Sequence, residues 1–538
     1  MSSSTGGRRA GLLIPLFSCP STASWGIGDI GDIEPITAWL AGAGQRILQL
    51  LPLNEMAPGQ RSPYSAISAM AIDPIFISLP QVAEFTALGG EAGLASSDRE
   101  TLAAVRRSPR IEHHQVRALK QRALRAAFER FLEREWRGGS ERGLGFQSYL
   151  SEQAWWLEDY SLFRALHARE RERPWTEWPD ALQRRDPPAI DRARRELADE
   201  VLYEQYLQWL AGSQWQRARQ HTHGIALFGD LPFMVDNDSA DVWVRQHQFR
   251  LDMSVGAPPD AFSASGQDWG MPVYQWSALA ADDYRWLRER ARRSADLFDG
   301  YRVDHLVGFY RTYGRLKQGV ARRSATGAEA AGDGFFTPPD EPSQRALGEI
   351  VLDLFRGAGA EIIAEDLGTV PDFVRASLAR LGVPGYRVFR WERQWHSAGW
   401  PFRDPSAYPQ VSVAASGTHD TEPVAVWWDA ATESERSLVS GLESVRRLSG
   451  GADLSRRPFD ATIRDLLLEV LFASASDLLL LPVQDAFGWR DRINEPATIS
   501  DHNWTYRLPW PVDRLDEVPE ARERQAQLSA WSARYGRI

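Results

Sequence analysis

Short apolar stretches that end in acidic residues recur along the chain, and they constrain its fold more than any other feature. The clearest examples are Leu297–Tyr310 (LFDGYRVDHLVGFY), Glu361–Leu367 (EIIAEDL) and Val411–Asp420 (VSVAASGTHD). Their β-branched and aromatic residues favour strands. In a (β/α)8 barrel the carboxyl ends of all strands meet on one face, where the active site lies. Asp304, Glu365 and Asp420 are therefore predicted to share one pocket.

Three carboxylates in one pocket indicate function rather than structure, because like charges repel and shift each other's pKa. Arg302 lies two residues before Asp304, so both side chains are predicted on the same face of their strand. A guanidinium beside a carboxylate favours the ionised form, which a nucleophile needs at neutral pH. His305 is predicted to point to the other face and to be structural.

Eight apolar stretches of this kind alternate with helical patterns such as Ile33–Ala43, Gln344–Arg356 and Ile463–Ser474. This alternation predicts an α/β fold, a closed (β/α)8 TIM barrel with large insertions. The predicted strands are Gly11–Leu16, Arg46–Leu51, Ile225–Phe233, Leu297–His305, Glu361–Leu367, Tyr386–Trp391, Val411–Ser416 and Leu478–Val483.

The domain organisation follows from where the sequence changes between strand-like apolar runs and apolar residues at helical spacing. Residues 1–83 are predicted to form the first part of the barrel, residues 84–219 a mainly helical inserted subdomain, and residues 220–538 the remainder. Within the insertion, the Arg-rich stretch Arg106–Arg142 is predicted to be a solvated face with i,i+4 ion pairs. Residues 254–276 are rich in Gly, Pro and aromatics, and we interpret Gly256–Trp276 as an irregular lid over the pocket.

Composition narrows the class of protein. The net charge of −10 over 538 residues argues against a nucleic-acid partner. The single cysteine, Cys19, is compatible with a reducing compartment, and no apolar run approaches the ~20 residues that span a membrane, so we expect a cytoplasmic location. Arg8-Arg9 followed by an apolar run and Cys19 faintly resembles a lipoprotein signal, but Pro15 interrupts that run and a first barrel strand is the preferred interpretation. The 22 tryptophans suit sugar faces or a large core.

Longer motifs follow one another in order along the chain. They are GLLIPLFS with SWGIGD, AGQRILQLLPL, SPYSAISA, GDLPFMVDNDSADVW, GAPPDAFSASGQDWGMPVYQW, YRVDH, IIAEDLG, SGTHD and RINEP. On these motifs, and over nearly its whole length, the chain resembles the amylomaltases, the 4-α-glucanotransferase (disproportionating enzyme) family related to the α-amylase clan. The resemblance implies transfer of α-1,4-glucan segments between maltooligosaccharides, in starch or glycogen metabolism, with neither cofactor nor metal.

The resemblance also implies roles for the three acids. Asp304 matches the nucleophile, Glu365 the general acid/base, and Asp420 the carboxylate that binds the sugar in the transition state. A retaining displacement needs two carboxyl groups ~5–5.5 Å apart, one of them protonated at rest. Burial and the negative neighbours Asp304 and Asp420 are therefore expected to raise the pKa of Glu365 toward ~6–7.

Four further residues are implied to bind substrate. Tyr64, Arg302 and His419 match residues that line the donor sugar's site, and Trp269 matches one that contacts the glucan chain. Trp504 and Trp510 are further candidates for an aromatic acceptor site. The chain departs from the usual family pattern in reading DHLVG after the nucleophile and Thr421-Glu422-Pro423 after GTHD. These departures bear on acceptor preference more than on the chemistry.

Three other functions compete with this interpretation. An α-amylase-type hydrolase would use the same three acids with water as acceptor. A metal-dependent barrel enzyme would use a divalent ion, although strand alternation separates His305 from Asp304 and Asp366 from Glu365. A glycan-binding protein without catalysis is disfavoured, because binding alone does not need three convergent acids.

Overall fold

Eight parallel strands close into a barrel in the computed structural model, which describes residues 7–258, 266–317, 334–496, 498 and 500–538. The barrel strands, in order around the barrel, are β1 (Arg9–Leu13), β2 (Ile47–Gln49), β3 (Ala226–Leu231), β8 (Gly300–Val303), β11 (Glu361–Ala364), β12 (Gly385–Val388), β13 (Ser412–Ala415) and β14 (Leu478–Pro482). Each lies within or overlaps a predicted strand, so the prediction of a closed (β/α)8 barrel is confirmed. The first of them, β1, lies within the stretch that faintly resembled a signal.

Apolar side chains fill the barrel interior beneath the strand ends. Ile47, Phe228, Ile363, Tyr386 and Leu480 belong to one buried cluster contributed by five strands. Glycine at position 300 makes room for the ring of Phe228, because a Cβ there would lie 2.6 Å from that ring. The interior is therefore a packed core, and a substrate must bind at an end of the barrel.

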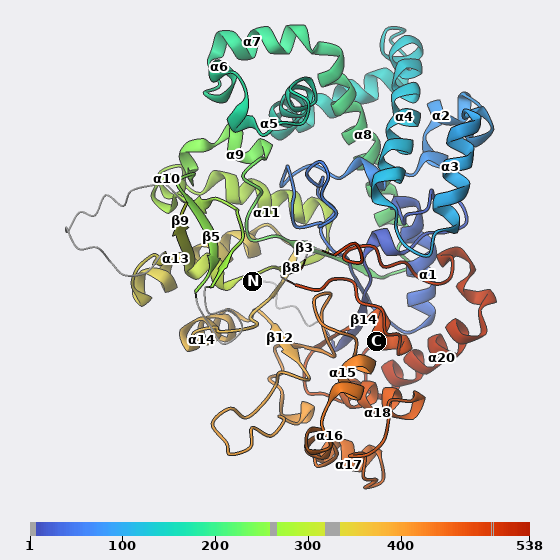
Figure 1. Ribbon diagram of the computed structural model, residues 1–538, viewed down its shortest axis with the longest axis vertical. Coiled ribbons are helices and arrows are strands. Elements are labelled where there is room, and N and C mark those ends of the chain that lie inside the picture. Colours follow the sequence, from blue (N-terminus) through green and yellow to red (C-terminus); the bar gives the residue numbers. More distant parts are fainter. Residues whose placement is uncertain (1–6, 259–265, 318–333, 497, 499) are drawn as a thin grey trace.

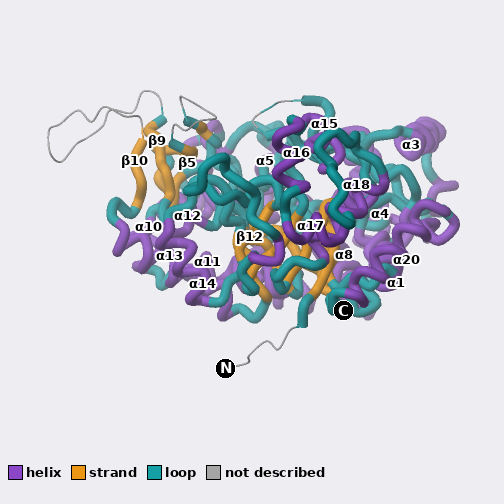
Figure 2. Tube along the Cα trace, turned by 90° about the horizontal axis from the view of Figure 1, so that it is seen from below, coloured by secondary structure: helices purple, strands orange, loops and turns teal. Residues whose placement is uncertain are grey.

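Helices surround the barrel on its outside (Figure 2). They are α1 (Ile33–Gly42), α9 (Ala240–Val244), α10 (Trp276–Ala281), α11 (Arg285–Leu297), α12 (Val307–Tyr310), α13 (Glu341–Gly357), α14 (Asp372–Leu381), α15 (Val424–Ala430), α16 (Glu433–Ser440), α17 (Glu443–Leu448), α18 (Ala461–Phe472), α19 (Val483–Phe487) and α20 (Pro519–Arg534). Asp340 and Asp460 cap α13 and α18 by accepting backbone N–H bonds from the first helical turn. None of the helices in the described part of the chain is long and apolar enough to cross a membrane.

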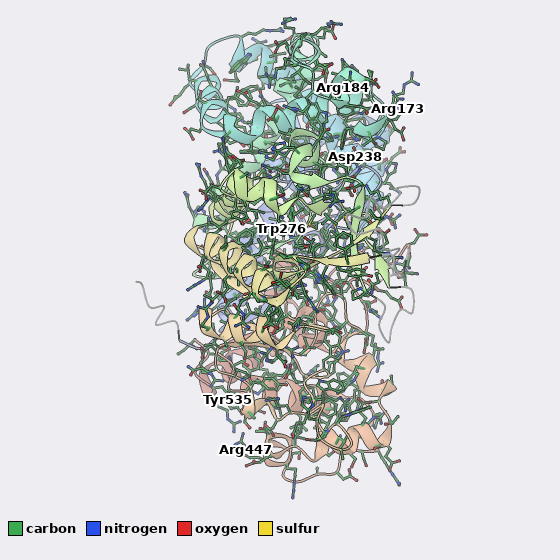
Figure 3. The ribbon with its side chains drawn as sticks, turned by 90° about the vertical axis from the view of Figure 1, so that its left-hand side faces the viewer. Arg173, Arg184, Asp238, Trp276, Arg447 and Tyr535 are labelled. Atoms are coloured by element: carbon green, nitrogen blue, oxygen red, sulfur yellow. The ribbon has the colours of Figure 1, made fainter. Side chains whose placement is uncertain are left out.

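A run of helices separates β2 from β3 and extends to the top of Figure 1. These helices are α2 (Ala83–Ala87), α3 (Ser96–Arg107), α4 (His113–Phe131), α5 (Glu141–Arg169), α6 (Asp180–Gln183), α7 (Pro187–Glu196) and α8 (Ala198–Gln220). Figure 3 shows Arg173 and Arg184 of this region at the opposite end of the molecule from Arg447.

The Arg-rich stretch Arg106–Arg142 was predicted to be a solvated face with i,i+4 ion pairs inside one helix, but its ion pairs reach other elements. Arg117 binds Asp73 at 2.7 Å, and Arg142 binds the buried Glu84 at 2.6 Å. These pairs join separate elements rather than successive turns of a helix, because the stretch packs against the loops that follow β2.

The predicted irregular lid also needs correction, since short strands flank its centre. They are β4 (Phe249–Arg250), β5 (Met253–Ala257), β6 (Gln267–Asp268) and β7 (Val273–Tyr274), and with β9 (Thr312–Leu316) and β10 (Gly334–Thr337) they form two small sheets beside the barrel. The tip, residues 259–265, lies outside the described residues. The Gly- and Pro-rich sequence concealed these strands because each is only two to five residues long.

Candidate active site

Asp304 and Glu365 directly follow neighbouring barrel strands. Val303 of β8 pairs with Ala364 of β11, so the two acids extend the same parallel pair at its carboxyl end. The Glu365 carboxylate accepts the backbone N–H of His305 and of Leu367, each at 2.9 Å. Backbone geometry therefore holds Glu365 beside the turn that carries Asp304.

A buried arginine lies among the carboxylates. Arg302, on β8, is 4% exposed, and its Nη1 contacts both carboxylate oxygens of Asp230 at 2.9 and 2.8 Å. Its Nη2 contacts Oδ1 of Asp304 at 2.8 Å, as the strand pattern predicted. Asp230 is opposite Arg302 in the pairing of β3 with β8. One guanidinium thus neutralises part of two carboxylates from adjacent strands.

Asp420 is held by groups from the end of β13 and from the loop after β14. His419 Nε2 lies 3.2 Å from one carboxylate oxygen, and the Asn494 amide donates to the other at 2.7 Å. Arg492 donates to the backbone carbonyl of Asp420 at 2.8 Å. The side chain of Asp420 nevertheless remains 40% exposed, so its carboxylate is accessible to a substrate.

Tyr64 belongs to the loop after β2 and lies at the carboxyl ends of the strands. Its hydroxyl donates to Asp230 at 2.7 Å, and its ring stacks on His419 with centroids 5.3 Å apart. Trp504 contacts both rings, with centroids 5.8 Å from each. Trp510 instead packs against Phe487 and Trp489. The structure therefore brings Trp504, but not Trp510, to the predicted pocket.

The carboxyl groups of the pocket differ in acidity. Removal from water and the charge of Asp304 raise the pKa of Glu365 to about 7, although Arg302 acts in the opposite direction. Burial also raises the pKa of Asp230 to about 6. Burial opposes ionisation of Asp420 too, but His419 and Asn494 outweigh it and lower its pKa to about 2. The predicted elevation of the Glu365 pKa is confirmed for burial and Asp304, whereas Asp420 is not among its causes. One pocket contains both a carboxyl group that titrates near neutrality and a carboxylate that stays ionised.

Trp269 directly follows β6 and contacts His305 beside the pocket. Its ring meets His305 edge-on with centroids 4.9 Å apart, and its indole N–H donates to Gln267 at 3.0 Å. His305 also packs against Phe233, and burial lowers the pKa of its imidazole to about 4. His305 thus connects Trp269 to Glu365, whose carboxylate its backbone N–H binds.

The side chains that a metal site would need are committed elsewhere. Asp366 binds Arg387 of β12 at 3.1 Å. His305 packs against the rings of Phe233 and Trp269. Across the described ranges, no group of three or more His, Cys, Asp or Glu side chains is arranged to hold a metal ion.

Two residues of the pocket were not predicted to have a role. Asp230 ends an apolar strand just as the three predicted acids do, so the same pattern could have identified it. Asn494 lies in the RINEP motif, but only its contact with Asp420 indicates what it does. The departures from the family pattern that follow Asp420 lie outside these contacts: Glu422 binds Arg390 at 2.7 Å, and the Thr421 hydroxyl donates to the carbonyl of Thr418 in a local turn.

Comparison with known proteins agrees with this arrangement. The sequence model of the 4-alpha-glucanotransferase family matches residues 14–513. The 4-alpha-glucanotransferase of Chlamydia pneumoniae is 32% identical, over 94% of this chain and 92% of its own. That of Thermus thermophilus is 31% identical, over 96% and 99%. A structure of the amylomaltase from Streptococcus agalactiae in complex with acarbose superposes with a TM-score of 0.81 at 25% identity, covering 98% of this chain and 99% of that one. The chain belongs to the 4-alpha-glucanotransferase family.

Proposed function

We propose that this 4-α-glucanotransferase acts on maltooligosaccharides and longer α-1,4-glucans by a retaining double displacement at Asp304 and Glu365. Asp304 attacks the anomeric carbon of the donor, and the glycosidic bond breaks as Glu365 gives its proton to the departing 4-oxygen. The acceptor's 4-hydroxyl then attacks the covalent glycosyl-enzyme while Glu365 takes back a proton. A new α-1,4 bond forms, and Asp304 leaves as a carboxylate.

The observation that carries this proposal is the contrast between the two carboxyl groups on adjacent strand ends. Glu365 has a pKa of about 7, so a large fraction is protonated at rest and it is ionised easily once the proton has been given away. Asp304 contacts the buried Arg302 at 2.8 Å, and its side chain is 28% exposed toward an incoming sugar. One group is thus suited to proton transfer and the other to nucleophilic attack.

Asp420, Tyr64, Arg302 and His419 would bind the sugar at the reacting centre. Asp420 stays ionised, so it can accept bonds from ring hydroxyls that strengthen as positive charge develops on the ring. Tyr64 is ordered by its bond to Asp230 and by its stack on His419. The inhibitor acarbose in the Streptococcus agalactiae structure supports an oligosaccharide as ligand of this fold.

Transfer in place of hydrolysis requires that an oriented acceptor sugar outcompetes bulk water. Trp269 lies half-buried against His305, where its ring is available to an acceptor, and Trp504, which is 8% exposed, backs the Tyr64 ring with apolar surface. Such surfaces would exclude water and stack on the acceptor.

Incubation with maltotriose alone tests the proposal. A transferase is expected to yield glucose and a ladder of longer glucans, whereas a hydrolase would yield only glucose and maltose. The Glu365→Gln variant is expected to lose the ladder while keeping its melting temperature. A wild-type product mixture without maltotetraose or longer chains would refute transfer, and a ladder formed by Glu365→Gln at the wild-type rate would refute the assigned proton donor.

A further inference from the structure

Exposed tryptophans gather in the loop that follows β12. Trp395 and Trp400 are 58% and 59% exposed, and Trp391 at the base of the loop is 45% exposed. The rings of Trp395 and Trp400 lie together, with centroids 6.0 Å apart and an angle of 53° between their planes. Large apolar side chains in contact with water in this way mark a binding surface more often than a structural one.

The backbone of this loop is ordered by its own hydrogen bonds. Arg393 and Phe402 form a β-bridge, and the N–H of Gln394 donates to the carbonyl of Pro401 at 2.9 Å. Within the tip, Ser397 donates back to Gln394 at 2.9 Å. The loop is therefore a closed hairpin that presents both tryptophans from fixed positions.

The base of the hairpin is braced against the body of the protein. The Arg393 guanidinium lies 3.8 Å from the ring centroid of Phe402 and pairs with Glu435 of α16. The ring of Phe402 stacks on that of Phe389, with centroids 5.6 Å apart and only 7° between their planes. Binding at the tip would consequently cost little conformational entropy, because the scaffold is already ordered.

The hairpin rises between two of the strand ends that carry the pocket. β12 lies between β11, which precedes Glu365, and β13, which precedes Asp420. Arg387 of β12 binds Asp366 at 3.1 Å, and Arg390 binds Glu422 at 2.7 Å. The loop projects at the lower left of Figure 1, on the side of the barrel away from helices α5–α8. A polymer that enters the pocket could thus continue onto the hairpin.

The chemistry of the tip indicates a neutral occupant. The segment Gln394–Pro401 (QWHSAGWP) contains no Asp, Glu, Lys or Arg, although such residues make up 25% of the chain. The Arg393 guanidinium at the base of the hairpin donates to the backbone carbonyl of Trp400 at 3.3 Å and pairs with Glu435, so its charge is compensated. Indole rings fit the apolar faces of pyranose rings, whereas an anionic polymer would need cationic side chains that this segment does not contain.

We propose that Trp395 and Trp400 form a secondary binding surface for a long α-1,4-glucan whose reacting segment lies in the pocket. This rests on the proposed function, and it identifies polymeric glucan rather than a short oligosaccharide as the substrate that benefits. Holding the chain at a second point raises the effective concentration of its reacting segment at the strand ends. A maltotriose molecule bound in the pocket gains nothing from the surface.

Kinetics of the double variant Trp395→Ala/Trp400→Ala with amylose and with maltotriose test the surface. We expect the KM for amylose to rise about tenfold and the kinetics with maltotriose to stay at wild-type values. Migration in a native gel that contains amylose should be slowed for the wild type and not for the double variant. The variant Trp395→Phe/Trp400→Phe, which keeps aromatic rings, should recover retardation. Leu144→Ala removes a side chain of equal exposure (59%) from α5 and serves as the matched control.

The outcomes separate the surface from the active site. Unchanged retardation and unchanged KM for amylose in the double alanine variant would overturn the proposal. Equal losses with maltotriose and amylose would overturn it too, because the tryptophans would then belong to the pocket. If the double variant melts early, the single variants Trp395→Ala and Trp400→Ala are measured in its place. Failure of the wild type to disproportionate maltotriose would instead count against the proposed function.

Discussion

Two glutamates in different parts of the molecule, Glu365 and Glu204, have the same elevated pKa and different surroundings. Burial raises the pKa of each to about 7. Glu365 follows a barrel strand, and two backbone N–H groups hold its carboxylate beside Asp304. Glu204 lies in the second turn of α8 and lines a cavity of about 490 Å³ among charged side chains of α4, α5 and α8.

Because Glu365 and Glu204 have the same pKa in unlike surroundings, a perturbed pKa does not by itself identify a catalytic group. Two arginines, Arg164 and Arg125, and two further glutamates, Glu55 and Glu200, surround Glu204. Such a mixture of opposite charges is typical of a structural ion-pair network. Arg164 lies 3.0 Å from Glu55, and both side chains are buried. Glu365 by contrast lies beside a second carboxylate that is open to solvent. What distinguishes the pocket is the pairing of a carboxyl group that titrates near neutrality with a solvent-accessible carboxyl group bound by Arg302 on the adjacent strand end.

The largest expected effect comes from removing the charge of Asp304. Asp304→Asn should lower kcat for disproportionation by about 10⁴-fold or more, because the substitution removes the carboxylate proposed as the nucleophile. Its melting temperature should stay near that of the wild type, since Arg302 keeps its contacts with the buried Asp230. Initial rates with maltotriose and a thermal melt provide the measurement.

The chain offers a matched control for this substitution. Arg250 and Asp252 have the same spacing as Arg302 and Asp304 and form a 2.7 Å ion pair. Asp252→Asn should retain the wild-type rate because its pair lies on the surface outside the pocket. Equal losses in the two variants would contradict the assignment of the pocket, as would full turnover by Asp304→Asn.

A smaller effect is expected from titration of Glu365. Since its pKa is raised to about 7, the proton that the leaving group needs is lost as the pH rises through that value. The quotient kcat/KM of the wild type should therefore fall about tenfold per pH unit above pH 7. The Glu204→Gln variant should show the same alkaline decline. A profile that stays flat to pH 9, or a limb abolished by Glu204→Gln, would show that the wrong glutamate has been chosen.

The smallest effect concerns stability, where the two glutamates should behave alike. The folded pKa of Glu204 lies above the ~4.3 of an unfolded glutamate, so the folded state binds the additional proton and stability falls as the pH rises from about 4.3 to about 7. One such group contributes at most about 1.4 kcal/mol per pH unit.

Melting temperatures measured across this pH range test the point. Glu204→Gln and Glu365→Gln should each show a shallower decline than the wild type, while only Glu204→Gln keeps transferase activity. Identical declines in the wild type and Glu204→Gln would mean that Glu204 titrates normally in the folded protein.

Much of the barrel was predictable because its signals are local. A buried parallel strand needs a short apolar run, and a functional strand end needs a polar residue directly after it, so both can be recognised within about ten residues. The short strands β6 and β7 were missed because nothing local distinguishes a two-residue strand from a loop. The Arg-rich stretch of α4 was misinterpreted for a related reason: its partners, such as Asp73 for Arg117, lie outside the helix.

The sequence by itself determined the eight strands, their order, and the acids at the ends of three of them, since alternation and strand ends are properties of consecutive residues. Only the tertiary structure decided that Arg302 binds Asp230 as well as Asp304, that Asn494 reaches Asp420, and that Glu365 and Glu204 share an acidity constant in unlike surroundings. These facts depend on burial and on contacts between residues distant in the sequence, which closure of the barrel and packing of the helices between β2 and β3 bring together.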